Sequence, residues 1–304
     1  MNSIPEIFVI IVTYKGMRWY DKCFSSLRES TLPVHTIVVD NTPGEKDANY
    51  IRERYPEIHL IKTEENLGFG KANNLGMRYA LDQGCDYVFL LNQDAWLIDF
   101  DIFSMLIEIA EQHKEYGIIS PMHVFPDGKT INMVLENATN KTSIALLTDL
   151  YKNNLKRIYN TNYINAAAWL LPRKTLEIIG GFDPIFTHYG EDDNYIDRIK
   201  FHGLGICLVP SIRIVHDTGT IELPFTDNKL QYFHQQQLLV NLTNICDDIS
   251  PMSYIRYCLR KCLISSLSGK YPRKYLNDIK YIYSKKSEII RSRSVNVLTG
   301  ESWL

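Results

Sequence analysis

The sequence lacks the cysteine and glycine patterns that mark several familiar kinds of functional site. Its 6 cysteines include no CxxC pair and no His/Cys cluster at zinc spacing, which favours reduced thiols in a cytoplasmic protein. No GxGxxG follows the first apolar run, and no GxxxxGK followed by Ser or Thr occurs anywhere. The phosphate-binding loops of dinucleotide enzymes and P-loop proteins therefore have no basis in this sequence.

The chain also lacks a strong net charge and a long hydrophobic run. Its formal net charge is -2, so its overall charge does not attract nucleic acid, and we do not expect nucleic acid as a partner. The apolar run at residues 7–12 is too short to span a bilayer and follows no basic segment. We therefore expect a cytoplasmic protein without a secretion signal.

Alternating strand-like and helix-like segments fill the first half of the chain. Apolar, β-branched runs predict buried strands at residues 7–12, 36–39, 58–61 and 87–91. Helical spacing separates them at residues 19–30, 46–55 and 70–83. This order predicts an α/β fold with a mainly parallel sheet and flanking helices. Further elements are predicted as helices at 102–112 and 194–202, a strand at 117–124, an ordered segment at 163–171 and a strand pair at 206–215.

The composition changes after Pro224, where strand signals become few and Tyr, Lys, Arg and Leu become frequent. We expect a catalytic domain at residues 1–224 and a segment of two or three helices at residues 225–304. Interleaved basic and aromatic residues on such helices are typical of a contact with an anionic membrane. They are equally typical of a solvated helical cap whose tyrosines pack on the first domain.

Polar residues follow the predicted strands at the edge where open α/β sheets bind ligands. Thr13 and Tyr14 follow the first strand, and Asp40 follows the second, where it could bond a base or ribose or could cap a helix. Asn92 and Asp94 follow the fourth strand, and alternate residues at a strand end point to the same side. Such a pair can hold a divalent ion together with a diphosphate, or it can close a turn.

Three acidic residues, Glu191, Asp192 and Asp193, stand in a row before a predicted helix. Crowded acids raise one another's pKa, which suits a general base, although acids at a helix N-terminus also complement the helix dipole. His216 follows the apolar run at residues 212–215 and could be a metal ligand or a structural histidine.

Taken in order, these segments resemble the family 2 nucleotide-sugar glycosyltransferases with the GT-A, Rossmann-like fold, particularly bacterial rhamnosyltransferase-like members. The resemblance spans most of residues 7–220. It rests on residues 10–14, 38–41, 66–74, 91–94, 180–183, 190–192 and 215–216. Their order and separation together are far more specific than any one of them.

The resemblance implies roles for individual residues. It implies a nucleotide-sugar site made by Thr13, Tyr14, Asp40, Asn66, Gly68, Asn74 and Asn92, with Trp169 on the side of the sugar and acceptor. Asp94 and His216 would contact a divalent cation, Mg²⁺ or Mn²⁺, and Asp192, or less readily Glu191, would be the catalytic base. Two positions depart from the family pattern, because Asn92 replaces the first acid of its DxD element and Asn194 replaces a later acid.

The implied activity is inverting transfer of a sugar, with rhamnose as the first candidate, from a dTDP- or UDP-sugar to a carbohydrate acceptor. The resemblance also implies a place in bacterial surface polysaccharide synthesis, with lipid-linked glycans at the inner membrane face among the acceptors. Two alternatives stay open. One is a carbohydrate-binding or scaffold protein on the same fold, which Asn92 favours, and the other is a nucleotidyltransferase or another nucleotide-sugar enzyme.

Overall fold

A nine-stranded mixed sheet forms the centre of the computed structural model, which describes residues 4–132, 141–218, 226–268 and 272–304. The strands are β1 (Ile7–Thr13), β2 (His35–Asp40), β3 (His59–Lys62), β4 (Tyr87–Leu91), β5 (Ala95–Leu97), β6 (Tyr116–Val124), β7 (Tyr159–Thr161), β8 (Ala168–Pro172) and β9 (Gly205–His216). The helices are α1 (Met17–Arg28), α2 (Lys46–Arg54), α3 (Gly68–Asp82), α4 (Ile102–Gln112), α5 (Lys141–Tyr151), α6 (Arg173–Ile179), α7 (Glu191–Phe201), α8 (Asp227–Thr243), α9 (Pro251–Leu267) and α10 (Arg273–Asn296).

The strands lie in the order β3-β2-β1-β4-β8-β6-β9-β5, and β7 pairs with the outside of β9. The first four strands of this order are parallel, as the alternating apolar runs predict. β8 runs antiparallel to β4, and β5 and β7 run antiparallel to β9. The predicted α/β fold is confirmed, although the sheet is parallel only from β3 to β4 and mixed beyond β4.

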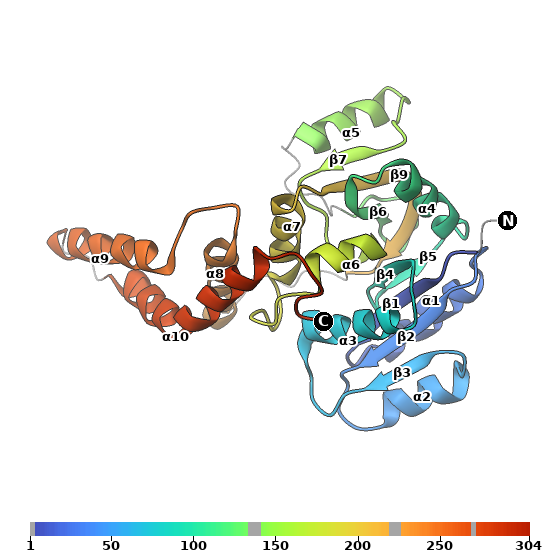
Figure 1. The fold of residues 1–304 in the computed structure, drawn as a ribbon, viewed down its shortest axis with the longest axis horizontal. Helices are drawn as coiled ribbons and strands as arrows, with labels where there is room; N and C mark the ends of the chain where they lie inside the picture. Colours follow the sequence, from blue (N-terminus) through green and yellow to red (C-terminus); the bar gives the residue numbers. More distant parts are fainter. Residues whose placement is uncertain (1–3, 133–140, 219–225, 269–271) are drawn as a thin grey trace.

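Helices cover both faces of this sheet (Figure 1). Alternate residues of β1 point to opposite faces, because side chains alternate along a strand. Ile10 packs in one core with α3, α6 and α7, whereas Ile11 packs in the other with α1, α2 and α4. Complete burial of such a side chain stabilises the fold by roughly 1.5–3 kcal/mol, which explains why the strands read as continuous apolar runs.

Several predicted elements differ from the observed ones for identifiable reasons. The predicted pair of strands at 206–215 is wrong, because β9 is one strand whose pairing with β6 shifts register near Pro121 and Pro210. Proline offers no backbone donor, so such positions favour irregular pairing over a regular ladder. The ordered segment predicted at 163–171 contains the start of β8 at Ala168. The helix α7 begins at Glu191 and not at Asn194, so the acidic residues form its first turn.

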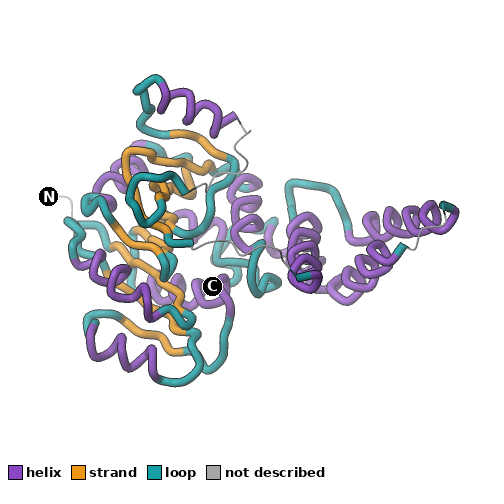
Figure 2. Tube along the Cα trace, turned by 180° about the vertical axis from the view of Figure 1, so that it is seen from behind, coloured by secondary structure: helices purple, strands orange, loops and turns teal. Residues whose placement is uncertain are grey.

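The C-terminal part consists of α8, α9 and α10 around a small core that includes Phe186, Leu239 and Ile282. Figure 2 shows α9 and α10 extending away from the sheet as a hairpin. The chain then returns to the sheet domain, where Gly181 donates from its backbone nitrogen to Ser302 and Gly300 donates to Ile178. The boundary predicted at 224/225 lies in residues 219–225, outside the described parts. Within those parts, no helix is long and apolar enough to cross a bilayer.

Candidate active site

A cleft opens at the edge of the sheet where β1, β2 and β4 end. Its cavity measures about 630 Å³, and its walls are the loops after these strands, the start of α3 and the segment at Thr187 and His188. Ligands of open α/β sheets bind at this carboxyl edge, so we take the cleft as the candidate active site. The residues singled out from the sequence that line it are Tyr14, Asn66, Gly68, Asn92 and Asp94.

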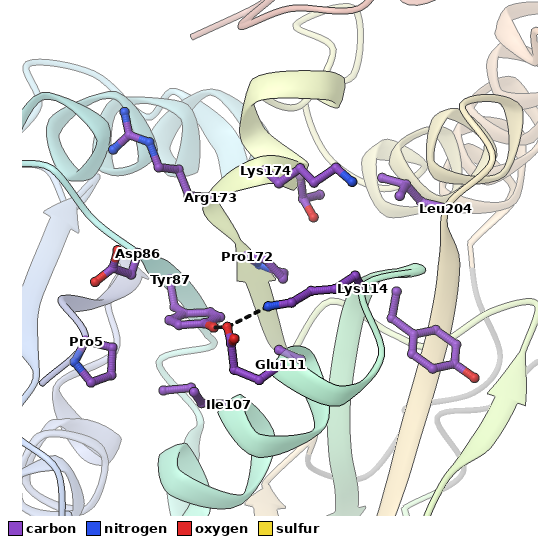
Figure 3. A pocket seen from close by; sticks show the side chains of 13 residues that line it. Pro5, Asp86, Tyr87, Ile107, Glu111, Lys114, Pro172, Arg173, Lys174 and Leu204 are labelled. Atoms are coloured by element: carbon purple, nitrogen blue, oxygen red, sulfur yellow. Dashed lines mark hydrogen bonds and ion pairs between the residues drawn. The ribbon is translucent and has the colours of Figure 1, made fainter. Parts of the chain in front are cut away.

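A second cavity, of about 510 Å³, lies at the opposite edge of the sheet, where β4 and β6 begin. Figure 3 shows the Glu111 carboxylate between the Tyr87 hydroxyl and the Lys114 ammonium, so these charged and polar groups already satisfy one another. Among the described residues that line this cavity, none was singled out from the sequence. The chemistry expected from the sequence therefore belongs to the first cleft.

Asp94 and His216 face each other where β5 pairs with β9. The antiparallel register pairs Ala95 with His216, which places the residue before β5 next to the residue that ends β9. The His216 Nε2 atom lies 3.5 Å from an Asp94 carboxylate oxygen and 3.4 Å from the Asn92 amide nitrogen. The three side chains therefore meet at one point on the rim of the cleft.

This meeting point fits a divalent cation that takes few ligands from the protein. The buried His216 Nδ1 atom has no hydrogen-bond partner in the described parts, whereas Nε2 faces Asn92 and Asp94. Asp94 adds a carboxylate oxygen, and those parts contain no cluster of three or more His, Cys, Asp or Glu. A diphosphate would have to supply further ligands, and the imidazole nitrogen favours Mn²⁺ over Mg²⁺.

Asp40 and Thr13 lie beneath the floor of the cleft and not on its surface. The Asp40 side chain is 0% exposed and accepts hydrogen bonds from the Thr13 hydroxyl at 3.0 Å and the Thr42 backbone nitrogen at 2.9 Å. Its second oxygen lies 3.6 Å from the Lys62 ammonium. Asp40 is thus part of a buried network that fixes the loop after β2, and its neighbour Asn41 lines the cavity instead.

Gln93, which the sequence analysis did not assign, holds the loop after β1 against the loop after β4. The Tyr14 backbone nitrogen donates to the Gln93 side-chain oxygen at 2.9 Å, and the Gln93 amide donates back to the Tyr14 backbone oxygen at 3.3 Å. A side chain at Gly16 would collide with Gln93, since a Cβ there would lie 1.9 Å from its oxygen. The only signal in the sequence was the position of Gln93 between Asn92 and Asp94.

Gly68 allows the loop before α7 to approach the start of α3. Its φ is 78°, and a Cβ there would lie 2.0 Å from the Thr187 backbone oxygen, so only glycine fits. Its backbone nitrogen donates to the Asn66 side chain at 2.9 Å. This contact makes Thr187 and His188 one wall of the cleft that also holds Asn92 and Asp94.

Asn74 and Trp169 were predicted to bind substrate, but the structure places both side chains away from the cavity. The Asn74 amide donates to the Phe182 backbone oxygen at 2.8 Å and accepts from the Phe182 nitrogen at 2.7 Å. It also donates to the Trp303 backbone oxygen at 3.0 Å. Trp169 is 0% exposed and packs against Phe182 and Tyr195. Both residues support the Gly-Gly-Phe turn that precedes the acidic cluster.

Glu191 and Asp192 begin α7 in unequal surroundings. Asp192 accepts a hydrogen bond from the Tyr163 hydroxyl at 3.0 Å and one from the Asp193 backbone nitrogen at 3.0 Å. One Glu191 oxygen is buried without any partner in the described parts. Burial raises the pKa of both carboxyls, that of Glu191 to about 8, and the neighbouring Asp192 adds to that rise. Hydrogen-bond donors around Asp192 stabilise its charged form, so Asp192 is better suited to act as an ionised carboxylate. Glu191 is better suited to keep its proton.

The segment before β8 connects Asp192 with the strand end that carries Asp94. The Asn92 backbone nitrogen donates to the Ala167 oxygen at 3.0 Å. The backbone of Ala166, one residue earlier, bonds Asp192 and lowers the pKa of that carboxyl against the effect of burial. The structure thus links Asp192 through one short segment to the place where Asp94 and His216 meet. A carboxylate base and a cation site that are connected in this way can serve a displacement at a diphosphate ester.

Comparisons with known proteins identify the family of this chain. The sequence model described as "Glycosyl transferase family 2" matches residues 8–177. The low-salt glycan biosynthesis hexosyltransferase Agl10 of Haloferax volcanii is 25% identical over 98% of this chain and 92% of its own length. The N-acetylglucosaminyl-diphospho-decaprenol L-rhamnosyltransferase of Mycobacterium tuberculosis is 26% identical over 68% of this chain and 75% of its own.

Among solved structures, the mannosyltransferase PcManGT of Pyrobaculum calidifontis, in complex with GDP-Man and Mn²⁺, has a similar fold. The TM-score is 0.54 at 16% sequence identity, and the match covers 97% of this chain and 74% of that one. At this level of identity the likeness concerns the fold alone.

Proposed function

The chain belongs to glycosyl transferase family 2, and from this premise we propose that its cleft binds a nucleoside-diphosphate sugar and transfers the sugar, with inversion, to a carbohydrate acceptor. Two observations support the proposal: Asp94 contacts His216 at the rim of the cleft, and the short segment at residues 166–167 connects Asp192 with the strand end that carries Asp94. A transferase needs both a carboxylate base and a cation site, whereas a carbohydrate-binding protein needs neither.

In the proposed reaction Asp192 accepts the proton of the acceptor hydroxyl. The acceptor oxygen forms its bond to the anomeric carbon while the bond from that carbon to the diphosphate oxygen breaks on the opposite face, which inverts the configuration. The Tyr163 hydroxyl holds Asp192 in place as the proton moves. A well-placed general base contributes roughly a hundredfold or more to the rate.

Asp94 and His216 are the residues that we propose to hold a divalent cation, with Mn²⁺ favoured over Mg²⁺ because one ligand is an imidazole. When bound, the cation would neutralise the charge that develops on the departing diphosphate. Asn92 takes the place of a carboxylate, so the protein contributes one negative charge there and not two. We therefore expect the cation to bind weakly alone and tightly together with the donor.

The finer identity of the substrates is also a proposal. The name of the M. tuberculosis relative supports rhamnose as the sugar and a lipid-linked glycan as the acceptor. We propose a dTDP-sugar as donor, with UDP-sugars next, and a role in the synthesis of surface polysaccharide. A lipid-linked acceptor would bring this cytoplasmic protein to the inner face of the membrane as a peripheral partner.

The decisive experiment measures release of nucleoside diphosphate from dTDP-rhamnose, a UDP-sugar and a GDP-sugar, each with Mn²⁺ or Mg²⁺ and with or without a glycan acceptor. We expect release that depends on both the acceptor and the cation. Asp192→Asn should bind the donor and release nothing, and Asp197→Asn, on the same helix, serves as the matched control. Tight donor binding without release in the wild-type protein would contradict the proposal and favour a carbohydrate-binding role.

A further inference from the structure

The helix α9 presents an apolar stripe that no other described part of the chain covers. Met252, Leu259, Leu263 and Leu267 follow one another at helical spacing, and their side chains are 42%, 50%, 67% and 89% exposed. Exposure rises steadily toward the end of the helix. A surface helix normally packs its apolar stripe against the protein core. The stripe of α9 faces away from the core, as in helices that contact a membrane or another apolar surface.

The charged residues of α9 and of the segment that follows it up to Asn277 are all basic. The sequence between Ile249 and Asn277 contains no Asp or Glu, and its basic residues are Arg256, Arg260, Lys261, Lys270, Arg273 and Lys274. Arg256 and Arg260 are exposed, and helical spacing places Arg256 within the stripe and Arg260 at its edge. Apolar side chains interspersed with and bordered by Arg and Lys match the boundary between acyl chains and anionic headgroups. Another protein surface would have to be both acidic and apolar to match equally well.

The position of α9 in the molecule leaves this stripe free to meet a surface. Figures 1 and 2 both show the hairpin of α9 and α10 reaching away from the sheet. α10 is a single helix of 24 residues that leads from the tip of this hairpin back to the sheet domain. There Ser292 and Asn296 donate hydrogen bonds to Asp183, in the turn before the acidic cluster.

We propose that α9 is an interfacial anchor, which lies in the plane of an anionic bilayer with the stripe from Met252 to Leu267 among the acyl chains. Its basic residues contact the phosphate groups, and α10 holds the active-site cleft at a fixed height above the membrane. This inference assigns a specific surface to the peripheral membrane contact proposed above. It rests on the proposed function only for the presence of a lipid-linked acceptor.

The test is co-sedimentation of the full chain with vesicles of phosphatidylcholine alone or of equal parts phosphatidylcholine and phosphatidylglycerol. We expect binding to the anionic vesicles and at least about tenfold weaker binding to the neutral ones. The double variant Leu263→Ser/Leu267→Ser should bind anionic vesicles about tenfold or more weakly than the wild type. The double variant Arg256→Gln/Arg260→Gln should lose a similar amount of affinity, and its remaining binding should depend less on salt concentration. Ile144→Ser/Leu147→Ser, which alters residues 52% and 49% exposed on α5, is the matched control and should bind as the wild type does.

The outcomes separate this proposal from the proposed function. Unchanged vesicle binding by the leucine variant, or no binding by the wild type, would overturn the anchor. Self-association in solution that the leucine variant abolishes would show that a second copy covers the stripe, and would also overturn it. Transfer to a water-soluble acceptor should be equal in all of these proteins. Absence of transfer in a wild type that binds vesicles would refute the enzyme activity and leave the anchor standing.

Discussion

Tyr163→Phe is the substitution that tests the carboxylate assignment most directly. It removes a single hydroxyl, which donates to Asp192 at 3.0 Å, and keeps the ring that fills the same space. A hydrogen bond to a charged acceptor contributes roughly 1.5–3 kcal/mol. If the reaction needs Asp192 as a carboxylate, loss of this bond should lower kcat/KM by roughly ten- to a hundredfold at the acidic end of the pH range.

The sign of the pH effect follows from the same bond. The Tyr163 hydroxyl lowers the pKa of Asp192 against the burial that raises it. Without the hydroxyl the pKa of Asp192 rises further, so the acidic limb of the pH–rate profile moves to higher pH, and activity recovers once Asp192 is ionised. A purely structural role would lower the rate at every pH by the same factor.

The assay is the pH dependence of kcat/KM for nucleoside diphosphate release with saturating cation. Tyr159→Phe is the matched control, because the Tyr159 hydroxyl donates to Asp149 at 2.8 Å and no cleft residue is involved. We expect this control to keep the wild-type profile. An unshifted acidic limb in Tyr163→Phe would refute the reasoning, as would an equal shift in the control.

Three further predictions concern the same site. Asp192→Asn should reduce turnover by at least about a hundredfold while donor affinity, measured by calorimetry, stays within about twofold of wild type. His216→Ala should lose most of the affinity for Mn²⁺ measured in the presence of donor, and retained affinity would remove His216 from the cation site. Burial raises the pKa of Glu191 from 4.5 to about 8, so the folded state holds a proton that the unfolded state has lost, and stability falls as pH rises between these values. Glu191→Gln should therefore raise Tm relative to wild type by an amount that grows as pH rises from 4.5 to about 8 and then levels off, and an unchanged difference across that range would contradict the raised pKa.

The sequence predicted the fold best where burial leaves a simple pattern. β1, β2, β3, β4 and β6 lie within one residue of their predicted bounds. β1, β4 and β6 are buried along almost their whole length, and strands buried on both faces must be continuous apolar runs. β5 and β7 were not predicted, since each has three residues and owes its existence to pairing with β9. Such short strands are fixed by their partners and not by local propensity. α6 was also missed, because seven residues are too few to show a helical period.

The candidate site was predictable as a set of motifs but not as a set of contacts. Asn74 and Trp169 belong to matching motifs, yet their side chains support the turn at Phe182 and do not reach the cavity. A buried amide that satisfies backbone groups and an amide that binds a ligand look the same in a sequence. Tyr163 carried no pattern at all, because its role depends on the distance to a residue 29 positions later.

Residues 302–304 return to the sheet domain and pack beneath the Phe182 turn. Leu304 packs against Gly181, and the Trp303 backbone oxygen accepts a hydrogen bond from Asn74. The turn therefore takes part of its support from residues more than a hundred positions later in the sequence. A truncation that removes residues 302–304 would leave the Asn74 amide with one partner fewer and open a gap beside Gly181.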